Sequence, residues 1–277
     1  MKKVLITGMS GLIGGLLRDH LDSVGGYKLT ALNRRPIDGV NSFQGDIANL
    51  DDIKLAFEGQ EVVVHLSAQL PSATWEDIAS ANLIGLRNVY EAARLSGVKR
   101  VVFASSGDAA RGVDRIPPFN SIVAGDYERV WPGWVKVNHN LVRPSSLYGA
   151  TKVWGEALGR VYSDEHNLSV LCVLIGAVPK ESRPQDIRQM STFLSHHDVN
   201  TMLRACIDAP DDLMYDVFFA VSNNKWNYRD LEHAKHVLGW EPRDSADEIG
   251  LTHTKSPVSY THLRAHETEA ALVCRLL

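Results

Sequence analysis

Short apolar runs alternate with amphipathic segments over the first two thirds of the chain. The apolar runs are KVLITG (3–8), YKLTALNRR (27–35), EVVVHLSA (61–68), KRVVFASS (99–106) and LSVLCVLIG (168–176). Each is short and rich in β-branched residues, as expected of a buried strand. The intervening segments, such as GLIGGLLRDHLDS and SANLIGLRNVYEAARLSG, place apolar residues at helical spacing. Continuous apolar strands alternating with helices predict an α/β fold whose parallel sheet is covered on both faces.

Right-handed crossovers between such strands give a doubly wound, Rossmann-like sheet. After residue 176 the pattern loosens, although HHDVNTMLRACIDA and YRDLEHAKHVLG still predict helices and DVFFAVS a strand. Residues 107–146 contain several prolines and glycines and are predicted to be loop-like. We therefore expect one domain over residues 1–255, with a small C-terminal substrate-side lobe formed mainly by about 177–255.

The last 22 or so residues differ from the rest of the chain. SPVSYTHLRAHETEAALVCRLL (256–277) closely resembles the translated read-through of a sequencing adapter. The alternative is a native C-terminal helix, since LRAHETEAALVCRLL has helical spacing. We treat the segment as a non-native tail and leave it out of the functional reasoning.

Composition excludes several function classes. The 277 residues are 44% hydrophobic and 22% charged, with a net charge of −4, so no basic face indicates nucleic acid. No apolar run approaches the roughly 20 residues that span a membrane. Three unpaired cysteines indicate neither a disulfide framework nor a zinc site, and a cytoplasmic location is the default. The adjacent His196, His197 and Asp198 point in different directions on a helix, so we expect no metal site.

A glycine-rich turn joins the first strand to the first helix. The spacing GxxGxxG lets the backbone turn tightly and approach a pyrophosphate at the helix N-terminus. A turn of this kind without a ligand is the alternative. The residues predicted to contact the phosphates are Gly8, Ser10, Gly11, Leu12, Ile13 and Gly14.

The second strand ends in Asn33, Arg34 and Arg35 and has no carboxylate there. An acidic residue at this point binds the ribose 2′-hydroxyl of NAD, whereas an arginine accommodates the 2′-phosphate of NADP. The chain is therefore predicted to bind NAD(P), leaning toward NADP. The alternative is that these arginines are solvated surface charges.

Tyr148 and Lys152 are four residues apart in PSSLYGATKVWGE and would lie side by side on a helix. A free tyrosine has a pKa of about 10 and is a poor base near neutrality. A fixed ammonium and an oxidised nicotinamide would both lower that pKa and make the phenol a proton acceptor. An ordinary helix surface would carry the same two residues.

Together these motifs resemble the extended short-chain dehydrogenase/reductase family, the NAD-dependent epimerase/dehydratase group. The matching elements are TGMSGLIG, GDI (45–47), HLSA (65–68), NLIG (82–85), FASS (103–106) and YGATK (148–152). The resemblance implies a catalytic Ser106, or Ser105 if the register shifts by one, with Tyr148 and Lys152. It also implies a homodimer through helices at about 77–96 and 148–167. The further cofactor contacts that it implies are Asp46, Ile47, Leu66, Ser67, Ala68, Asn82, Tyr148, Lys152 and Ile175.

The second half resembles uronate dehydrogenases and related sugar 1-dehydrogenases. That similarity implies substrate contacts from Ser72, Ser106, Gly107, Asp108 and Arg188. Arg188 would grip a substrate carboxylate, or alternatively form a structural salt bridge. Gly107 and Asp108 replace an Asn-His pair, and Leu70 and Leu174 stand where the pattern has a serine and an arginine. These departures leave uronates, neutral aldoses and sugar phosphates open as substrates.

The expected function is NAD(P)-dependent oxidation of a sugar or sugar acid, at the anomeric carbon and giving a lactone. A nucleotide-sugar epimerase or dehydratase is one alternative, although dehydratases need an Asp-Glu pair where Gly107 and Asp108 stand. A non-catalytic NADP(H)-binding sensor is another, although such proteins often lose the tyrosine. Trp131 and Trp134 could stack on a sugar ring, although packing in the core or in a lid is the preferred interpretation.

Overall fold

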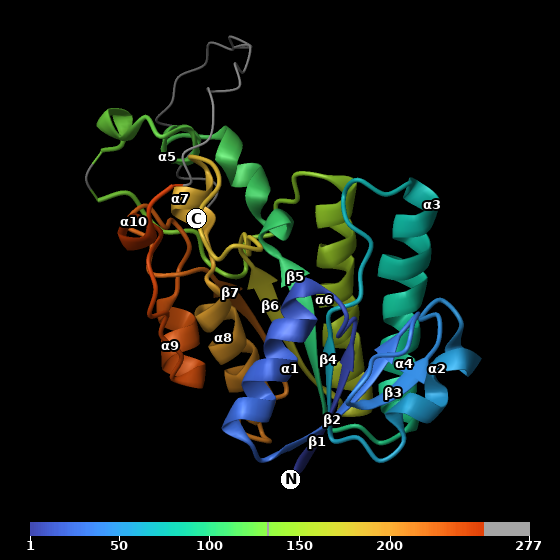
Figure 1. The fold of residues 1–277 in the computed structure, drawn as a ribbon. Coiled ribbons are helices and arrows are strands. Elements are labelled where there is room, and N and C mark those ends of the chain that lie inside the picture. The colour runs from blue at the N-terminus through green and yellow to red at the C-terminus, as the bar shows by residue number, and fades with distance from the viewer. Residues whose placement is uncertain (132, 252–277) are drawn as a thin grey trace.

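The computed structural model describes residues 1–131 and 133–251 and contains a seven-stranded, wholly parallel sheet (Figure 1). Its strand order is β3-β2-β1-β4-β5-β6-β7, so the order reverses between β1 and β4. Ligands of open α/β sheets bind at the carboxyl ends of strands beside such a reversal. The strands are β1 Lys2–Thr7, β2 Tyr27–Asn33, β3 Asn41–Gln44, β4 Val62–His65, β5 Arg100–Ser106, β6 Ser169–Ile175 and β7 Tyr215–Ala220.

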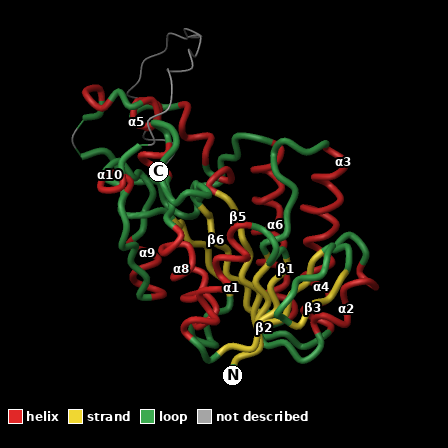
Figure 2. Tube along the Cα trace, viewed as in Figure 1, coloured by secondary structure: helices red, strands yellow, loops and turns green. Residues whose placement is uncertain are grey.

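Helices cover both faces of the sheet, as Figure 2 shows in red around the yellow strands. One face carries α2 (Leu50–Phe57), α4 (Leu86–Leu95) and α6 (Leu147–His166), and the other α1 (Leu12–Val24), α8 (His196–Asp208) and α9 (Glu232–Leu238). The remaining elements are α3 Trp75–Ile78, α5 Phe119–Ala124, α7 Gln189–Thr192, α10 Ala246–Ile249, the π-helix η1 Ala79–Gly85 and the 3₁₀-helices η2 Gly107–Ala109, η3 Arg111–Arg115 and η4 Tyr127–Arg129.

Alternate side chains of each strand enter two separate apolar layers. Val63 and Val101 pack with Tyr90 and Phe57 on one face, while Val64 and Val102 pack with Leu17 on the other. Strands buried on both sides need apolar residues at every position, which explains the continuous runs in the sequence. Side-chain caps start α6 and α8, since Ser146 accepts a hydrogen bond from Gly149 N and Ser195 one from Asp198 N.

The predicted doubly wound α/β fold is confirmed. β3 was not predicted, because only Phe43 of its four residues is apolar. The prediction that 107–146 is loop-like was wrong in part, because this stretch contains η2, η3, α5 and η4. The predicted tail at 256–277 lies outside the described residues. Over the part of the chain that is described, no helix has the length and apolar character to cross a membrane.

Two segments distant in sequence meet above the carboxyl ends of the strands. The stretch from η2 to η4 lies beside α7, at the upper left of Figure 1. Arg188, just before α7, pairs there with Asp114 of η3. β7 adds to the main sheet and α8 packs against α1, so part of the region after residue 177 completes the sheet itself.

Candidate active site

The turn after β1 has room for glycine alone at two positions. Gly8 has φ of +74°, and a Cβ there would lie 2.9 Å from Ser67 N. A Cβ on Gly14 would lie 2.5 Å from both Gly8 O and Met9 Cα. The first turn of α1 therefore packs directly onto the loop, and a side chain at Gly14 would push the helix away. This close packing is the arrangement that lets a loop backbone approach a pyrophosphate.

The N-terminus of α1 is free to bind an anion. Gly11 caps it without any side-chain hydrogen bond, and the first turn contains no acidic residue. Gly11 N donates to Gly8 O at 3.0 Å, which closes the turn. Leu12 is exposed and Ile13 packs into the core beside it. The remaining N–H groups and the helix dipole fit a dinucleotide phosphate.

The end of β2 lies next to this turn. Asn33 Oδ1 accepts hydrogen bonds from Ser10 N at 3.2 Å and Ser10 Oγ at 3.3 Å. Its Nδ2 is buried and has no partner among the described residues, so one donor remains for a ligand. Arg34 and Arg35 are exposed, and neither guanidinium forms an ion pair within residues 1–131 and 133–251.

Asp46 and Ile47 follow β3 and differ in environment. Asp46 is exposed, and its Oδ1 accepts a hydrogen bond from Ala48 N at 2.9 Å. Ile47 is 8% exposed and lies in the apolar layer on the α4 side. Asn88 holds this loop by donating to the carbonyl oxygens of Ile47 and Ala48. Asp46 can therefore meet an adenine from solvent, while Ile47 fixes the loop.

The loop after β4 is held against the glycine turn. Leu66, Ser67 and Ala68 are half-buried, and Ser67 N donates to Thr7 Oγ1 at 3.3 Å. Asn82 is 4% exposed and exchanges hydrogen bonds with the backbone of Gln69. It belongs to η1, and single π-helical turns often occur at functional sites. Asn82 thus fixes the loop that would face the nicotinamide.

The two serines at the end of β5 differ in their partners. Ser105 is buried and donates a very short hydrogen bond to Glu156. Ser106 is more accessible and lies beside Tyr148, where it can form a hydrogen bond with the phenol. Its Oγ also accepts from Asp108 N at 3.2 Å. Ser106 is therefore the serine beside the phenol, while Ser105 is engaged on the other side of the strand.

Lys152 lies beneath the Tyr148 ring. Its Nζ donates to Ala104 O at 2.8 Å and lies 5.4 Å from the centre of that ring. Burial lowers the pKa of Lys152 to about 8, although the nearby Glu156 raises it. Burial and, to a lesser extent, the nearby Asp108 raise the pKa of Tyr148 to about 12, although hydrogen bonding to Ser106 acts to lower it. The expected lowering of the Tyr148 pKa is therefore not produced by the chain's own residues.

Arg188 is not free to grip a carboxylate by itself. Its Nε lies 3.2 Å from Asp114 Oδ2, and Arg111 Nε lies 3.7 Å from the same oxygen. Arg111 Nη1 also lies 3.3 Å from Asp108 Oδ1. A series of ion pairs therefore connects Arg188 with Asp108, which lies two positions after Ser106. We call Asp108, Arg111, Asp114 and Arg188, with Arg229 described next, the charged cluster.

Arg229 was missed by the sequence reasoning. It is 2% exposed, and its Nη2 donates to Tyr228 Oη at 3.1 Å, while Tyr228 donates to Asp114. A Cβ on Gly107 would lie 3.8 Å from the same Nη2, so the guanidinium borders the catalytic strand end. Its Nη1 is buried without a described partner. No motif marks it, because its neighbours come from β5 and η3.

The other predicted substrate residues lie at varied positions. Gly107 is buried, and a Cβ added to it would lie 3.5 Å from Ile175 O. The ends of β5 and β6 are therefore close together. Ser72 is exposed in a turn and bonds to none of the other candidate residues. Trp131 is 45% exposed, whereas Trp134 packs against the core. The geometry thus brings Ser106, Gly107, Asp108, Tyr148, Lys152 and Ile175 together and leaves Ser72 apart.

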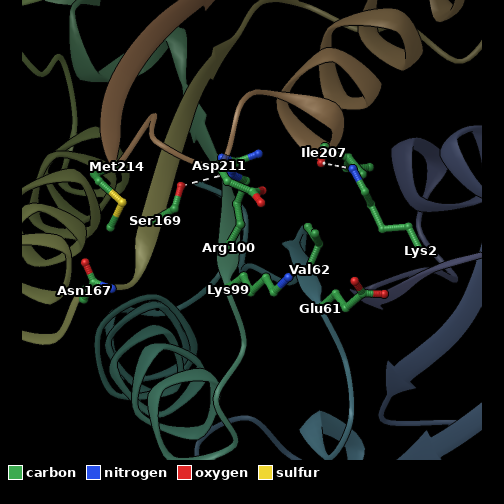
Figure 3. Close-up of a pocket in the computed structure, with 10 residues that line it drawn as sticks. All are labelled: Lys2, Glu61, Val62, Lys99, Arg100, Asn167, Ser169, Ile207, Asp211 and Met214. Carbon is green, nitrogen blue, oxygen red and sulfur yellow. Dashed lines mark hydrogen bonds between the residues drawn. The ribbon is translucent and has the colours of Figure 1, made fainter.

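A cavity of about 300 Å³ lies at the opposite edge of the sheet, where β1, β4, β5 and β6 begin (Figure 3). Arg100 occupies its wall and donates to the carbonyl oxygens of Ala209 and Pro210, both at 2.6 Å. Because these carbonyls and Ser169 Oγ satisfy the guanidinium, it serves to hold the loop after α8. The candidate catalytic residues lie at the other, carboxyl edge of the sheet.

Comparison with known proteins places this geometry in context. Residues 4–196 match the model of the NAD dependent epimerase/dehydratase family. The chain is 31% identical over 260 residues to NAD-dependent glucose-6-phosphate dehydrogenase of Haloferax volcanii, covering 89% of this chain and 95% of that protein. It is 32% identical over 266 residues to the L-arabinose 1-dehydrogenase (NAD(P)(+)) of the same organism, covering 90% and 99%.

Similarity extends to solved structures. A mutant of uronate dehydrogenase from Agrobacterium tumefaciens, complexed with NAD, superposes with a TM-score of 0.74 at 31% identity. The match covers 90% of this chain and 87% of that one. The overall fold of this chain is therefore similar to that of the uronate dehydrogenase.

Proposed function

The chain belongs to the NAD dependent epimerase/dehydratase family, and we propose that it is an NAD(P)-dependent dehydrogenase acting on a sugar or sugar acid. Oxidation would take place at the anomeric carbon and give a lactone. One observation carries the proposal: Ser106 and Tyr148 lie side by side at the carboxyl edge of the sheet, with Lys152 buried behind the phenol. The similar proteins named above are dehydrogenases of sugars or sugar acids, which supports the same reaction class here.

The chain's residues would divide the proton chemistry between them. A bound oxidised nicotinamide supplies the hydride acceptor and a positive charge near the phenol. Tyr148 would accept the proton of the anomeric hydroxyl while Ser106 donates a hydrogen bond to the same oxygen. Lys152, held by Ala104 O, would keep its ammonium close to the phenol, and the positive charge of the bound nicotinamide would offset the burial that raises the Tyr148 pKa. The hydride leaves the carbon and the proton leaves its oxygen, which gives the lactone.

The alternatives receive less support. A dehydratase needs an Asp-Glu pair after the catalytic serine or threonine, and Gly107 and Asp108 occupy those two positions here. Both Haloferax volcanii relatives bear dehydrogenase names, rather than the name of an epimerase or of a sensor. The presence of Ser106, Tyr148 and Lys152 at the carboxyl edge of the sheet is explained most simply by a dehydrogenase of this family.

The charged cluster favours an anionic sugar. It contains three arginines, Arg111, Arg188 and Arg229, against the two carboxylates of Asp108 and Asp114. A buried guanidinium with an unpaired N–H is costly unless an anion reaches it. We therefore propose a carboxylate or phosphate on the substrate, with Arg229 rather than Arg188 as its principal contact.

A substrate panel tests the proposed function. Glucuronate, galacturonate and glucose 6-phosphate would be compared with glucose and L-arabinose, each with NAD and NADP. We expect reduced nicotinamide to form fastest with an anionic sugar, and a lactone to appear as product. Absence of turnover with every sugar and both cofactors would overturn the proposed activity.

Replacing Arg229 tests the choice of an anionic substrate. Arg229→Met keeps an unbranched apolar stem and removes the guanidinium charge, so the KM of the anionic sugar should rise about 10-fold, as for a lost hydrogen bond to a charged group. The KM of a neutral sugar should change much less, and Arg229→Lys should retain the preference. An equal effect on neutral and anionic sugars would show that Arg229 acts only in packing.

The exposed pair Arg34 and Arg35 supports a preference for NADP within this proposal. Arg34→Ala should raise the KM of NADP about 10-fold and that of NAD far less, because only NADP places a phosphate there. Lys28→Ala, an exposed cation at the other end of β2, is the matched control and should leave both values unchanged. Equal changes for NAD and NADP would contradict the preference.

A homodimer is also part of the proposal. Apolar side chains on the two predicted interface helices are unusually exposed, with Ile84 56%, Leu95 55% and Val161 50% accessible. Pairing of η1–α4 and α6 with a second copy would bury them. Sedimentation equilibrium should give twice the chain mass, and a monomer at micromolar concentration would exclude this.

A further inference from the structure

Three residues from separate segments meet at the β7 edge of the sheet, away from the proposed reaction site. His139 lies in the loop of residues 134–141, Asp216 is the second residue of β7, and His233 lies on α9. One potential ligand atom from each residue lies within 4.8 Å of the others. No motif in the sequence indicates this cluster, because the fold alone brings its members together.

The contacts between the three side chains are close. His233 Nε2 lies 2.8 Å from Asp216 Oδ1, and the rings of His139 and His233 stack with centroids 3.8 Å apart and planes 9° from parallel. His233 also stacks on Phe218 with a centroid distance of 5.4 Å. Phe218 belongs to the apolar layer, so one wall of the cluster is dry and the ring of His233 is held in place.

His139 is the member whose polar atom lacks a partner. Its Nδ1 is buried and makes no hydrogen bond within the described residues. A buried polar nitrogen without a partner is uncommon, because it loses its hydration without compensation. Stacking on His233 contacts the faces of the rings and leaves His139 Nδ1 unpaired among the described residues. His233 Nε2 is hydrogen-bonded to Asp216 Oδ1, so a metal ion would replace the proton that these two atoms share. Two imidazole nitrogens and a carboxylate oxygen are therefore gathered in one place.

We propose that His139, Asp216 and His233 bind a zinc ion. Two imidazoles and a carboxylate form a ligand set that zinc favours, and a fourth position would be left for water. Tetrahedral zinc with bonds of about 2.0–2.1 Å places its ligand atoms about 3.3 Å apart. The ligand atoms of this cluster would close by up to about 1.5 Å, which a ring rotation of His139 on its loop can supply.

Zinc at this cluster would fasten a loop that borders the proposed active site. Val137 N donates to Tyr228 O at 2.7 Å, and Asp230 N donates to Val137 O at 2.9 Å. These bonds flank Arg229. Because His139 lies two residues after Val137, the ion would tie the backbone around Arg229 to β7 and α9. The role of the ion is thus structural, and it holds the wall of the substrate site.

Zinc binding to the full chain tests the proposal. Protein freed of metal by a chelator, and carrying no affinity tag, is titrated with zinc chloride against a chromophoric competitor. We expect one site that His139→Ala or His233→Ala weakens at least about 100-fold. His236→Ala, an exposed histidine on the same helix, is the matched control and should bind as the wild type does. The histidines at positions 262 and 266 are present in all four proteins and cancel.

Three further measurements separate loss of zinc binding from misfolding of a variant. Asp216→Asn keeps the side-chain volume and should also weaken binding, with an unchanged circular dichroism spectrum. At a hundredfold excess over its Kd, zinc should raise the wild-type Tm by about 5 °C and leave that of His139→Ala unchanged. X-ray absorption should detect two imidazoles on the bound zinc. Equal affinity of wild type and His139→Ala, or fewer than two imidazoles, would overturn the proposal.

Discussion

Tyr148→Phe is expected to lower kcat by at least about 100-fold while the protein still folds and binds its cofactor. The substitution removes only the phenolic oxygen, whose described partner is Ser106. The ring remains above Lys152, so the helix and the glycine turn keep their packing. Without that oxygen the anomeric hydroxyl loses its proposed proton acceptor, while Lys152 Nζ stays hydrogen-bonded to Ala104 O.

A second tyrosine on the same helix provides the control. Tyr162 stacks on Tyr90 and donates to Glu91 at 3.0 Å, far from Ser106. Tyr162→Phe should cost about 1 kcal/mol of unfolding free energy, as for one lost hydrogen bond, and leave kcat unchanged. Steady-state kinetics with saturating cofactor measure both variants. Wild-type kcat in Tyr148→Phe would remove this residue from the mechanism.

Gly14→Ala is expected to weaken cofactor binding on the order of 100-fold, the scale of a displacement of about 1 Å in a site. The new Cβ would lie 2.5 Å from Gly8 O and from Met9 Cα, and both are backbone atoms that cannot swing aside. The first turn of α1 must therefore move away from the loop, which separates the helix N-terminus from the phosphate position. The strain should also lower the unfolding free energy by about 1–3 kcal/mol.

The adjacent glycine offers a sharp control. A Cβ on Gly15 would meet nothing nearer than Met9 O at 3.9 Å. Because alanine stabilises a helix interior relative to glycine, Gly15→Ala should gain about 0.5–1 kcal/mol and bind cofactor normally. Fluorescence titration with reduced nicotinamide cofactor compares the two proteins. Equal affinity in Gly14→Ala and Gly15→Ala would mean that the turn does not hold the phosphates.

The sequence was informative where local chemistry decides the structure. A strand buried on both faces must be apolar throughout, so β1, β4, β5 and β6 could be predicted from composition alone. The short and mostly polar β3 lacks that signal and is held by its pairing with β2. The glycine turn was recognisable because tight backbone approach tolerates few residue types.

Only those residues of the candidate site that belong to a sequence motif could be predicted. Ser106, Tyr148 and Lys152 carry a family pattern, whereas Arg229 and Asp114 become neighbours only after β5, η3 and the segment before α9 come together. The direction of the Tyr148 pKa was also beyond the sequence, because it depends on how deeply the phenol is buried. The ion pair between Arg188 and Asp114 also could not be predicted, because only the fold brings the segment before α7 to η3.

One measurement tests the central claim most directly. The preferred sugar is prepared with deuterium at the anomeric carbon, and the reduced cofactor formed by the wild-type enzyme is analysed by mass spectrometry. The account predicts one deuterium in each reduced cofactor molecule and a slower reaction than with the unlabelled sugar. Reduced cofactor without deuterium would contradict hydride transfer from that carbon, and with it the proposed function.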